Sequence, residues 1–364
     1  MNLIRLKVKA LIKQHHIYKK RFWAGVLLAQ FVLFFTASRI EFAVRFFESF
    51  FEFQKAFHQK LFASVGFSLG DAGYIMLGVI LIFFCLKILN KKTQQSYLLK
   101  ALILLNILYF TYQIFWGMLY FQKPIITKLS QEKITLQETK ALTIKYLELS
   151  KKARSAVEED EDGVFKVYNL TAIKTEIFQN QDQLPEFLAK KKGTSVNSIK
   201  PSLFRGVMSY SGILGYYNPF TAEAQYNPEL PATYLPFTLA HESSHQLGYA
   251  REQEANFIAY LIGKNSPNPD LNYSTSYFVL KSLLNSLSEK NPEFVRKVID
   301  QYSPGMKRDR LAEKKFVKQH EGVLDVFFGF TNDLFLKSNQ QDGSITYSYF
   351  VDLMIRYERN SGGK

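Results

Sequence analysis

A pair of histidines on either side of a glutamate is the feature of this sequence best suited to chemistry. His241 and His245 flank Glu242 in the pentapeptide His-Glu-Ser-Ser-His. Residues four apart share one face of a helix, so both imidazoles can bind one metal ion while Glu242 lies beside a water on that ion. The spacing predicts a Zn²⁺ site in which Glu242 is the catalytic general base.

A third metal ligand is needed, because a catalytic zinc ion usually has three protein ligands and one open position. Glu252 and Glu254 follow the motif closely. We expect Glu252 to be the ligand, because small residues share its helix face and allow a close approach, whereas Glu254 shares a face with large apolar residues. Glu254 is the alternative. Asn256, one turn after Glu252, is expected to hydrogen-bond a ligating histidine. The third ligand of HExxHxxGxxH metalloproteases would fall at Arg251, which cannot serve.

Local breaks indicate which elements position these residues. Pro236 suits the first turn of the motif helix, and Gly248 suits a left-handed turn that ends it. A second helix is expected from about residue 251 to residue 262.

A small β-sheet is expected before the motif helix. Glycines with β-branched and aromatic residues over 206–224 predict two short strands. Residues 222–226 are either a sheet edge to which a substrate peptide adds or an ordinary hairpin strand. The expected substrate contacts are Tyr217, Ala222, Glu223 and Ala224. Candidates for stabilising an oxyanion are Tyr210, Tyr216, Tyr217 and His320, each with packing as its alternative role.

Three apolar stretches lie within the first 121 residues, at 22–38, 72–89 and 101–121. At about 1.5 Å per residue, each approaches the roughly 30 Å needed to cross a bilayer. We expect a membrane domain over 1–121, with the first stretch retained as an anchor because no clear cleavage pattern follows it, and a second domain over 122–364. The phenylalanine-rich segment 41–63 is either an amphipathic helix at the outer interface or a helix packed on the spans.

Lysine and arginine residues set the expected orientation. Residues 1–21 carry many basic residues and no acid, and the loop before the third stretch is also basic. The positive-inside rule places both in the cytoplasm and everything after residue 121 outside. The net charge of +14 is explained by these membrane-flanking groups, so lipid, and not nucleic acid, is the expected partner. The single cysteine, Cys85, excludes an intramolecular disulfide and a cysteine-ligated zinc site.

The rest of the chain indicates a mainly α (α+β) fold. A long helix is expected over 130–156, strand-like alternation over 165–177 and a helix over 182–192. The C-terminal half is expected to be helical over 274–289, 292–301, 305–320, 323–339 and 347–359.

Four segments together carry a family resemblance: 66–71, 217–224, 236–250 and 252–257. They resemble an uncharacterised bacterial family of membrane-anchored, zincin-like HExxH proteins, catalogued as a domain of unknown function, over nearly the whole chain, including 332–343. More distantly, Glu252 with Ala255 and Asn256 is similar to the ExxAD element of gluzincin-type membrane metallopeptidases, with Asn in place of Asp and a shorter spacing from His245. The resemblance implies a multi-pass protein of the bacterial inner membrane with a periplasmic zincin-like domain.

These observations predict a membrane-anchored zinc metallopeptidase that acts on a peptide or protein substrate. The alternative is a non-catalytic zincin-like scaffold or sensor that binds metal or peptide. A transporter is disfavoured, because the apolar stretches contain neither an acid nor a repeated broken helix.

Overall fold

The computed structural model describes residues 19–188, 191–194, 196–322 and 346–361. The chain divides into two compact units. The first unit comprises residues 1–50 and 70–122, and the second comprises 51–69 and 123–364. One boundary between the units lies at 122/123, and residues 51–69 belong with the C-terminal part of the chain.

The first unit is built from long apolar helices. Among the described residues, three helices are long and apolar enough to cross a membrane: α2 (Lys20–Ala37), α4 (Leu69–Leu89) and α5 (Gln94–Phe115). Helix α2 packs against α5, and the 3-10 helix η2 (Gly117–Phe121) follows α5. Three candidate spans were expected at nearly these places. The third begins seven residues earlier than expected, and α4 begins early enough to include Asp71 in its first turn.

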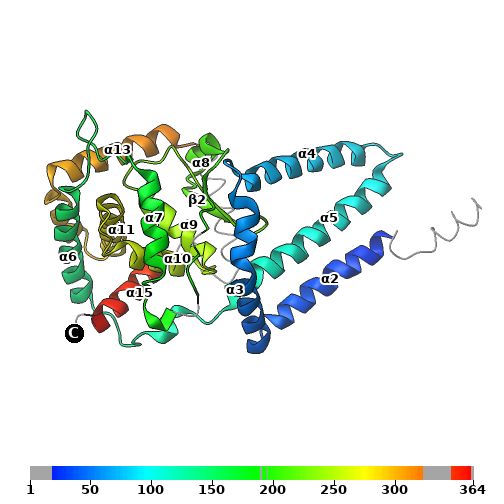
Figure 1. Ribbon diagram of the computed structural model, residues 1–364, viewed down its shortest axis with the longest axis horizontal. Coiled ribbons are helices and arrows are strands. Elements are labelled where there is room, and N and C mark those ends of the chain that lie inside the picture. Colours follow the sequence, from blue (N-terminus) through cyan, green and yellow to red (C-terminus); the bar gives the residue numbers. More distant parts are fainter. Residues whose placement is uncertain (1–18, 189–190, 195, 323–345, 362–364) are drawn as a thin grey trace, which may run out of the picture. The chain divides into compact units, whose positions relative to one another are not determined.

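The second unit is mainly helical (Figure 1). Its helices are η3 (Ile125–Lys128), α6 (Leu136–Arg154), α7 (Leu170–Gln181), η4 (Glu186–Leu188), α8 (Arg205–Ser211), α9 (Leu235–Gln246), α10 (Glu252–Gly263), α11 (Pro269–Leu287), α12 (Pro292–Asp300), α13 (Pro304–His320) and α15 (Thr346–Ser361). The expected helix over 323–339 lies outside the described residues.

Local sequence explains where most of these helices begin. Thr135 and Glu138 form a reciprocal capping box at the start of α6. Helices α11, α12 and α13 each begin with proline after an Asn or Ser side chain that caps the helix. The strand expected over 165–177 is wrong, because Asn169 caps α7 and Ile173 and Ile177 are buried on one helical face.

A three-stranded mixed sheet lies beside the motif helix α9. Its strands are β1 (Ile199–Pro201), β2 (Gly215–Asn218) and β3 (Glu223–Tyr226), in the order β1-β3-β2. Strand β3 pairs parallel with β1 and antiparallel with β2. Of the two alternatives for residues 222–226, the structure has the ordinary hairpin strand: β3 is central and pairs antiparallel with β2, while β1 and β2 are the edge strands.

The core of the second unit forms where α9, α10 and α11 meet. Helix α9 packs against α10, α11 and the sheet, and α6 packs along α11 (Figure 1). Leu239 and Ala240 of α9 are fully buried, and the Phe237 ring stacks on Phe278 with centroids 3.7 Å apart. Burying each large apolar side chain contributes about 1.5–3 kcal/mol, so these contacts hold α9 firmly in the core.

Helix α3 (Glu41–Ala63) runs through both units, because the division falls at Phe50. In the second unit, Lys55 Nζ donates to the Lys192 carbonyl at 2.7 Å, and Gln59 Nε2 donates to the Gln246 carbonyl at 3.2 Å. A ring nitrogen of His58 lies 3.1 Å from the Phe220 carbonyl oxygen. One face of the expected interfacial helix is therefore part of the second unit.

Candidate metal centre

The two motif histidines and Glu252 converge on one point. His241 Nε2 lies 3.1 Å from Glu252 Oε2, and His245 Nε2 lies 3.5 Å from Glu252 Oε1. The candidate ligand atoms of all three residues lie within 4.8 Å of one another. A tetrahedral zinc ion with bonds of about 2.0–2.2 Å separates its ligand atoms by about 3.3 Å. The donor types therefore fit Zn²⁺, and separations of up to 4.8 Å would have to close by as much as about 1.5 Å around the ion.

Two helices and one turn bring these ligands together. Helix α9 carries both histidines, and Glu252 is the first residue of α10, which packs directly on α9. Ala255 and Ala259 are fully buried on α10, and their small side chains permit the close approach. Gly248 allows the reversal between the helices with a φ of +94°, where a Cβ would also lie 2.8 Å from the Phe51 ring.

The outer nitrogen of each histidine ring is held by an oxygen atom. His241 Nδ1 lies 2.8 Å from Asn256 Oδ1, and His245 Nδ1 lies 2.6 Å from the Tyr249 carbonyl oxygen. Because oxygen is the acceptor in both cases, we assign a proton to Nδ1, so Nε2 is the nitrogen that faces Glu252 and would bind a metal ion in the neutral ring. Asn256 lies where the sequence predicted it. Tyr249 was missed, because its contribution is a backbone carbonyl that no residue type reveals.

The alternative ligand Glu254 has other partners. Its Oε1 accepts from the Ile125 backbone N–H at 2.7 Å and from Arg251 at 3.3 Å. These bonds hold the chain just after the first unit against α10. The structure thus brings Glu252, and not Glu254, to the histidines.

The electrostatics of His245 and Glu252 favour a positive charge between them. Burial opposes ionisation of both His245 and Glu252, but their mutual attraction outweighs it. The Glu252 charge and hydrogen bond raise the pKa of His245 to about 9, and the two histidines lower the pKa of Glu252. The cluster therefore stabilises one positive charge between the rings and the carboxylate, which either a proton or a metal ion can supply.

The Glu242 side chain is buried beside the cluster formed by His241, His245 and Glu252. Its side chain is only 3% exposed, and its Oε2 has no hydrogen-bond partner among the described residues. Burial is the main cause that raises the pKa of Glu242 to about 7; the Glu252 charge adds to this, while the histidines oppose it. A carboxyl group that exchanges a proton near neutral pH is suited to general acid–base work.

A glycine in the edge strand leaves room for this carboxyl group. A Cβ on Gly215, the first residue of β2, would lie 2.6 Å from Glu242 Oε1 and 2.8 Å from the Gln225 carbonyl oxygen. Glycine is therefore required where β2 passes Glu242. The sequence contains Gly215, but it did not indicate that Glu242 requires a glycine at this position.

Three of the expected substrate contacts lie in or beside the central strand β3. Ala222, Glu223 and Ala224 are buried. Gln246 Nε2 donates to the Ala222 carbonyl at 3.1 Å, and Glu223 forms a buried ion pair with Lys200 at 2.7 Å. Strand β3 thus has neighbours on both sides, and a substrate contact at these residues stays a prediction.

The structure also shows where the candidates for stabilising an oxyanion lie. Tyr216 and Tyr217 belong to edge strand β2, and burial raises the pKa of Tyr217. Tyr210 packs against the ring of His320 with centroids 4.9 Å apart. His320 belongs to α13, and its Nδ1 lies 2.8 Å from the Phe316 carbonyl oxygen, so its contacts are structural.

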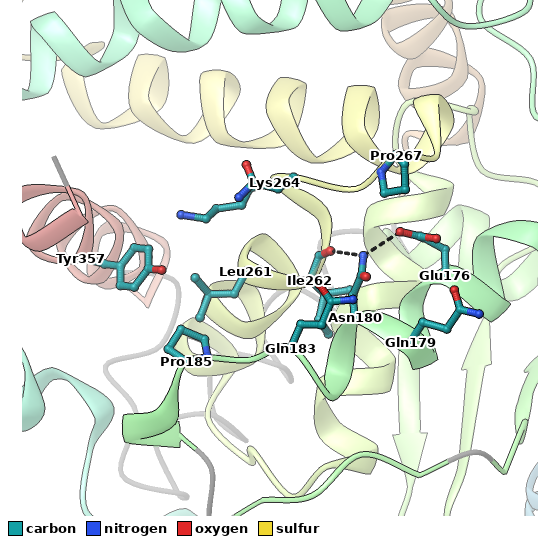
Figure 2. Close-up of a pocket in the computed structure, with 11 residues that line it drawn as sticks. Glu176, Gln179, Asn180, Gln183, Pro185, Leu261, Ile262, Lys264, Pro267 and Tyr357 are labelled. Atoms are coloured by element: carbon teal, nitrogen blue, oxygen red, sulfur yellow. Dashed lines mark hydrogen bonds between the residues drawn. The ribbon is translucent and has the colours of Figure 1, made fainter. Parts of the chain in front are cut away.

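A separate pocket of about 400 Å³ lies between the ends of α7 and α10 and Tyr357 of α15 (Figure 2). None of the three cluster residues lines it. Asn180 donates to the Glu176 carboxylate at 2.9 Å and to the Ile262 carbonyl at 3.0 Å, so these polar groups tie α7 to α10 (Figure 2).

Comparison with known proteins places the chain in a family. A family model described as a protein of unknown function (DUF3810) matches residues 46–355. No curated protein and no solved structure matches the chain. The match begins within α3 and ends within α15, so it includes the candidate metal centre and most of both units. The chain belongs to the DUF3810 family of proteins of unknown function.

Proposed function

We propose that this protein is a membrane-anchored zinc metallopeptidase. The observation that carries the proposal is the convergence of His241, His245 and Glu252 on one point, with Glu242 buried beside them. Two imidazoles and one carboxylate form the ligand set of gluzincin-type hydrolases, which leave a fourth position open. The small sheet beside the motif helix supports a zincin-like domain.

Each residue has a distinct part in this proposal. His241, His245 and Glu252 hold the zinc ion, which when bound supplies a Lewis acid that activates water and polarises the scissile carbonyl. Glu242 accepts the proton of the attacking water and returns it to the leaving amine. Asn256 and the Tyr249 carbonyl keep both imidazoles in the ligating orientation.

The proposed location is the bacterial inner membrane, with the N-terminus in the cytoplasm. The three candidate spans among the described residues support membrane anchoring, and three crossings would carry the residues after α5 to the side opposite the N-terminus. Lys91 and Lys92, between α4 and α5, favour the cytoplasm for that loop. The substrate is then an extracytoplasmic peptide or protein. Tyr217 stays a predicted substrate contact, because it belongs to the same strand as Gly215.

The decisive experiment uses the full chain in nanodiscs, because residues 51–69 belong to the second unit. We expect one bound zinc ion per chain, retained in Glu242→Gln, together with peptide-library cleavage that Glu242→Gln abolishes. Glu252→Gln should lose zinc, whereas the matched variant Glu254→Gln should keep it. A chain without stoichiometric zinc contradicts the proposal. Bound zinc with equal behaviour of wild type and Glu242→Gln would instead indicate a non-catalytic scaffold or sensor.

A further inference from the structure

Helix α3 carries a stripe of large apolar side chains that none of the described residues covers. Phe53, Phe57 and Leu61 are 87%, 67% and 55% exposed. They recur every fourth residue and so form one continuous stripe along three turns. Phe42 and Phe46 extend the same stripe toward the start of the helix and are also exposed. A row of exposed aromatic residues of this length marks an interaction surface.

The opposite face of the same helix is buried in the second unit. Phe51, Lys55, His58 and Gln59 are all buried. At about 100° per residue, these positions centre roughly on the side of the helix opposite Phe53 and Phe57. The apolar stripe therefore faces away from the second unit.

The short linkers that join α3 to its neighbouring helices indicate which surface contacts this stripe. Three residues separate the candidate span α2 from α3, and five separate α3 from the candidate span α4. Helix α3 is too charged to be a candidate span itself, since it carries Glu48, Glu52 and Lys60 among other charges. Both of its ends are therefore tied, by linkers of at most about 11 and 18 Å, to the same face of the bilayer.

The linker after α3 is also held in place. Lys200 Nζ donates to the carbonyl oxygens of Phe62 at 2.7 Å and of Phe67 at 3.1 Å, and the Leu69 N–H donates to Glu223 at 3.2 Å. These bonds join the end of α3 and the start of α4 to strands β1 and β3. The end of α3 thus cannot move away from the sheet without breaking the hydrogen bonds that Lys200 donates to Phe62 and Phe67.

We propose that α3 lies in the bilayer interface with Phe53, Phe57 and Leu61 among the lipids, and that its other face carries the metal centre. A 23-residue helix is about 35 Å long, and with both ends anchored it lies along the membrane surface. Lys60, next to the stripe, can extend its ammonium group to the headgroups. The lipid bilayer is the one surface that both neighbouring spans already bring to this helix.

This arrangement sets the distance between the site and the membrane. Gln59 bonds the carbonyl of Gln246, which directly follows the ligand His245, and Phe51 packs on Gly248. The end of the ligand helix is then about one helix diameter, roughly 10 Å, from the lipid-facing stripe. On the basis of the proposed peptidase function, the substrates are peptide segments close to the membrane surface, in proteins that are themselves anchored in the bilayer.

The lipid contact can be tested without any catalytic assay. In full-length Cys85→Ser protein in phosphatidylcholine/phosphatidylglycerol nanodiscs, nitroxide labels are placed at Phe57→Cys and, as a matched control, at Leu311→Cys, an exposed apolar position on α13. We expect the label at 57 to collide with oxygen and be shielded from a water-soluble nickel complex, and the label at 311 to show the reverse. A label at 57 as accessible to nickel as that at 311 overturns the proposal. Phe57→Trp quenching by brominated lipid provides a second measurement.

The substrate class is tested separately. One peptide that the protein cleaves is presented free and coupled to a lipid through a short linker. We expect the lipid-coupled form to be cleaved at least about tenfold faster at equal bulk concentration, because tethering raises its effective concentration at the site. A longer rigid spacer that lifts the peptide away from the surface should remove this gain. Equal rates for all three forms overturn the assignment of membrane-proximal substrates, whereas cleavage of none contradicts the peptidase function and leaves the label result intact.

Discussion

Asn256 Oδ1 accepts a hydrogen bond from His241 Nδ1 across 2.8 Å, which turns the other ring nitrogen toward Glu252. We predict that Asn256→Ala lowers zinc affinity by about 10–100-fold, because the imidazole loses the contact that sets its tautomer and orientation. Asn256→Asp keeps an oxygen acceptor and should stay close to wild type. Zinc dissociation constants measured by chelator competition check this. Equal affinities for wild type and Asn256→Ala would show that the hydrogen bond does not orient the ligand.

The close contact between Gly215 and Glu242 predicts that Gly215→Ala lowers peptide cleavage by about 100-fold, since the new methyl group must displace the general base. Zinc content should not change, because the atoms nearest to a Cβ at residue 215 belong to Glu242 and Gln225 and not to a candidate ligand. Gly206→Ala is the control, because a Cβ at that position meets nothing within 4 Å. The measurement is kcat/KM together with metal analysis of both variants. Full activity in Gly215→Ala would mean that the position of Glu242 is not critical.

The buried ion pair between Lys200 and Glu223 predicts a large loss of stability when one partner is removed. Lys200→Met leaves a buried carboxylate without its partner, and we expect a cost of about 3–5 kcal/mol in the free energy of unfolding. Lys151→Met, which removes the more exposed pair with Glu148, should cost about 0–1 kcal/mol. Denaturant unfolding in detergent compares the two. Adding Glu223→Gln to Lys200→Met should recover part of the loss, and an additive double variant would argue against direct coupling.

The raised pKa of Asp270 predicts how the stability of the protein changes with pH. Burial, with a smaller contribution from the Glu158 charge, raises the pKa of Asp270 from 3.8 to about 6. Between these values the folded chain binds more protons than the unfolded chain, so this group lowers stability as pH rises from 3.8 to 6, and its penalty is constant above that. Asp270→Asn should therefore have the same Tm as wild type near pH 4 and a higher Tm above pH 6. A Tm difference that does not change with pH would contradict this.

The sequence predicted those parts of the site that depend on local spacing. The motif helix, the break at Gly248 and the preference for Glu252 all follow from helical periodicity and turn chemistry, because such signals lie within a few residues of the atoms they position. The three apolar helices were found for the same reason.

The failures involve partners that are distant in the sequence. Whether β3 is an edge or a central strand depends on β1, more than twenty residues earlier, which the local pattern does not show. Residues 165–177 alternate like a strand, but the cap at Asn169 and the burial of Ile173 favour a helix. The role of Phe51 and Gln59 could not be predicted, because their partners lie almost two hundred residues away.

The position of residues 51–69 also has a consequence for biosynthesis. This segment is made before α4 and α5, whereas Gly248, on which Phe51 packs, is made 248 − 51 = 197 residues later. At about 5–20 residues per second, the ribosome needs roughly 10–40 s to bridge that interval. During this time Lys55 and Gln59 lack their partners, and two further spans must enter the bilayer. The second unit is therefore completed only after membrane insertion, and a lipid-bound α3 would keep its segment in place until the rest of the chain arrives.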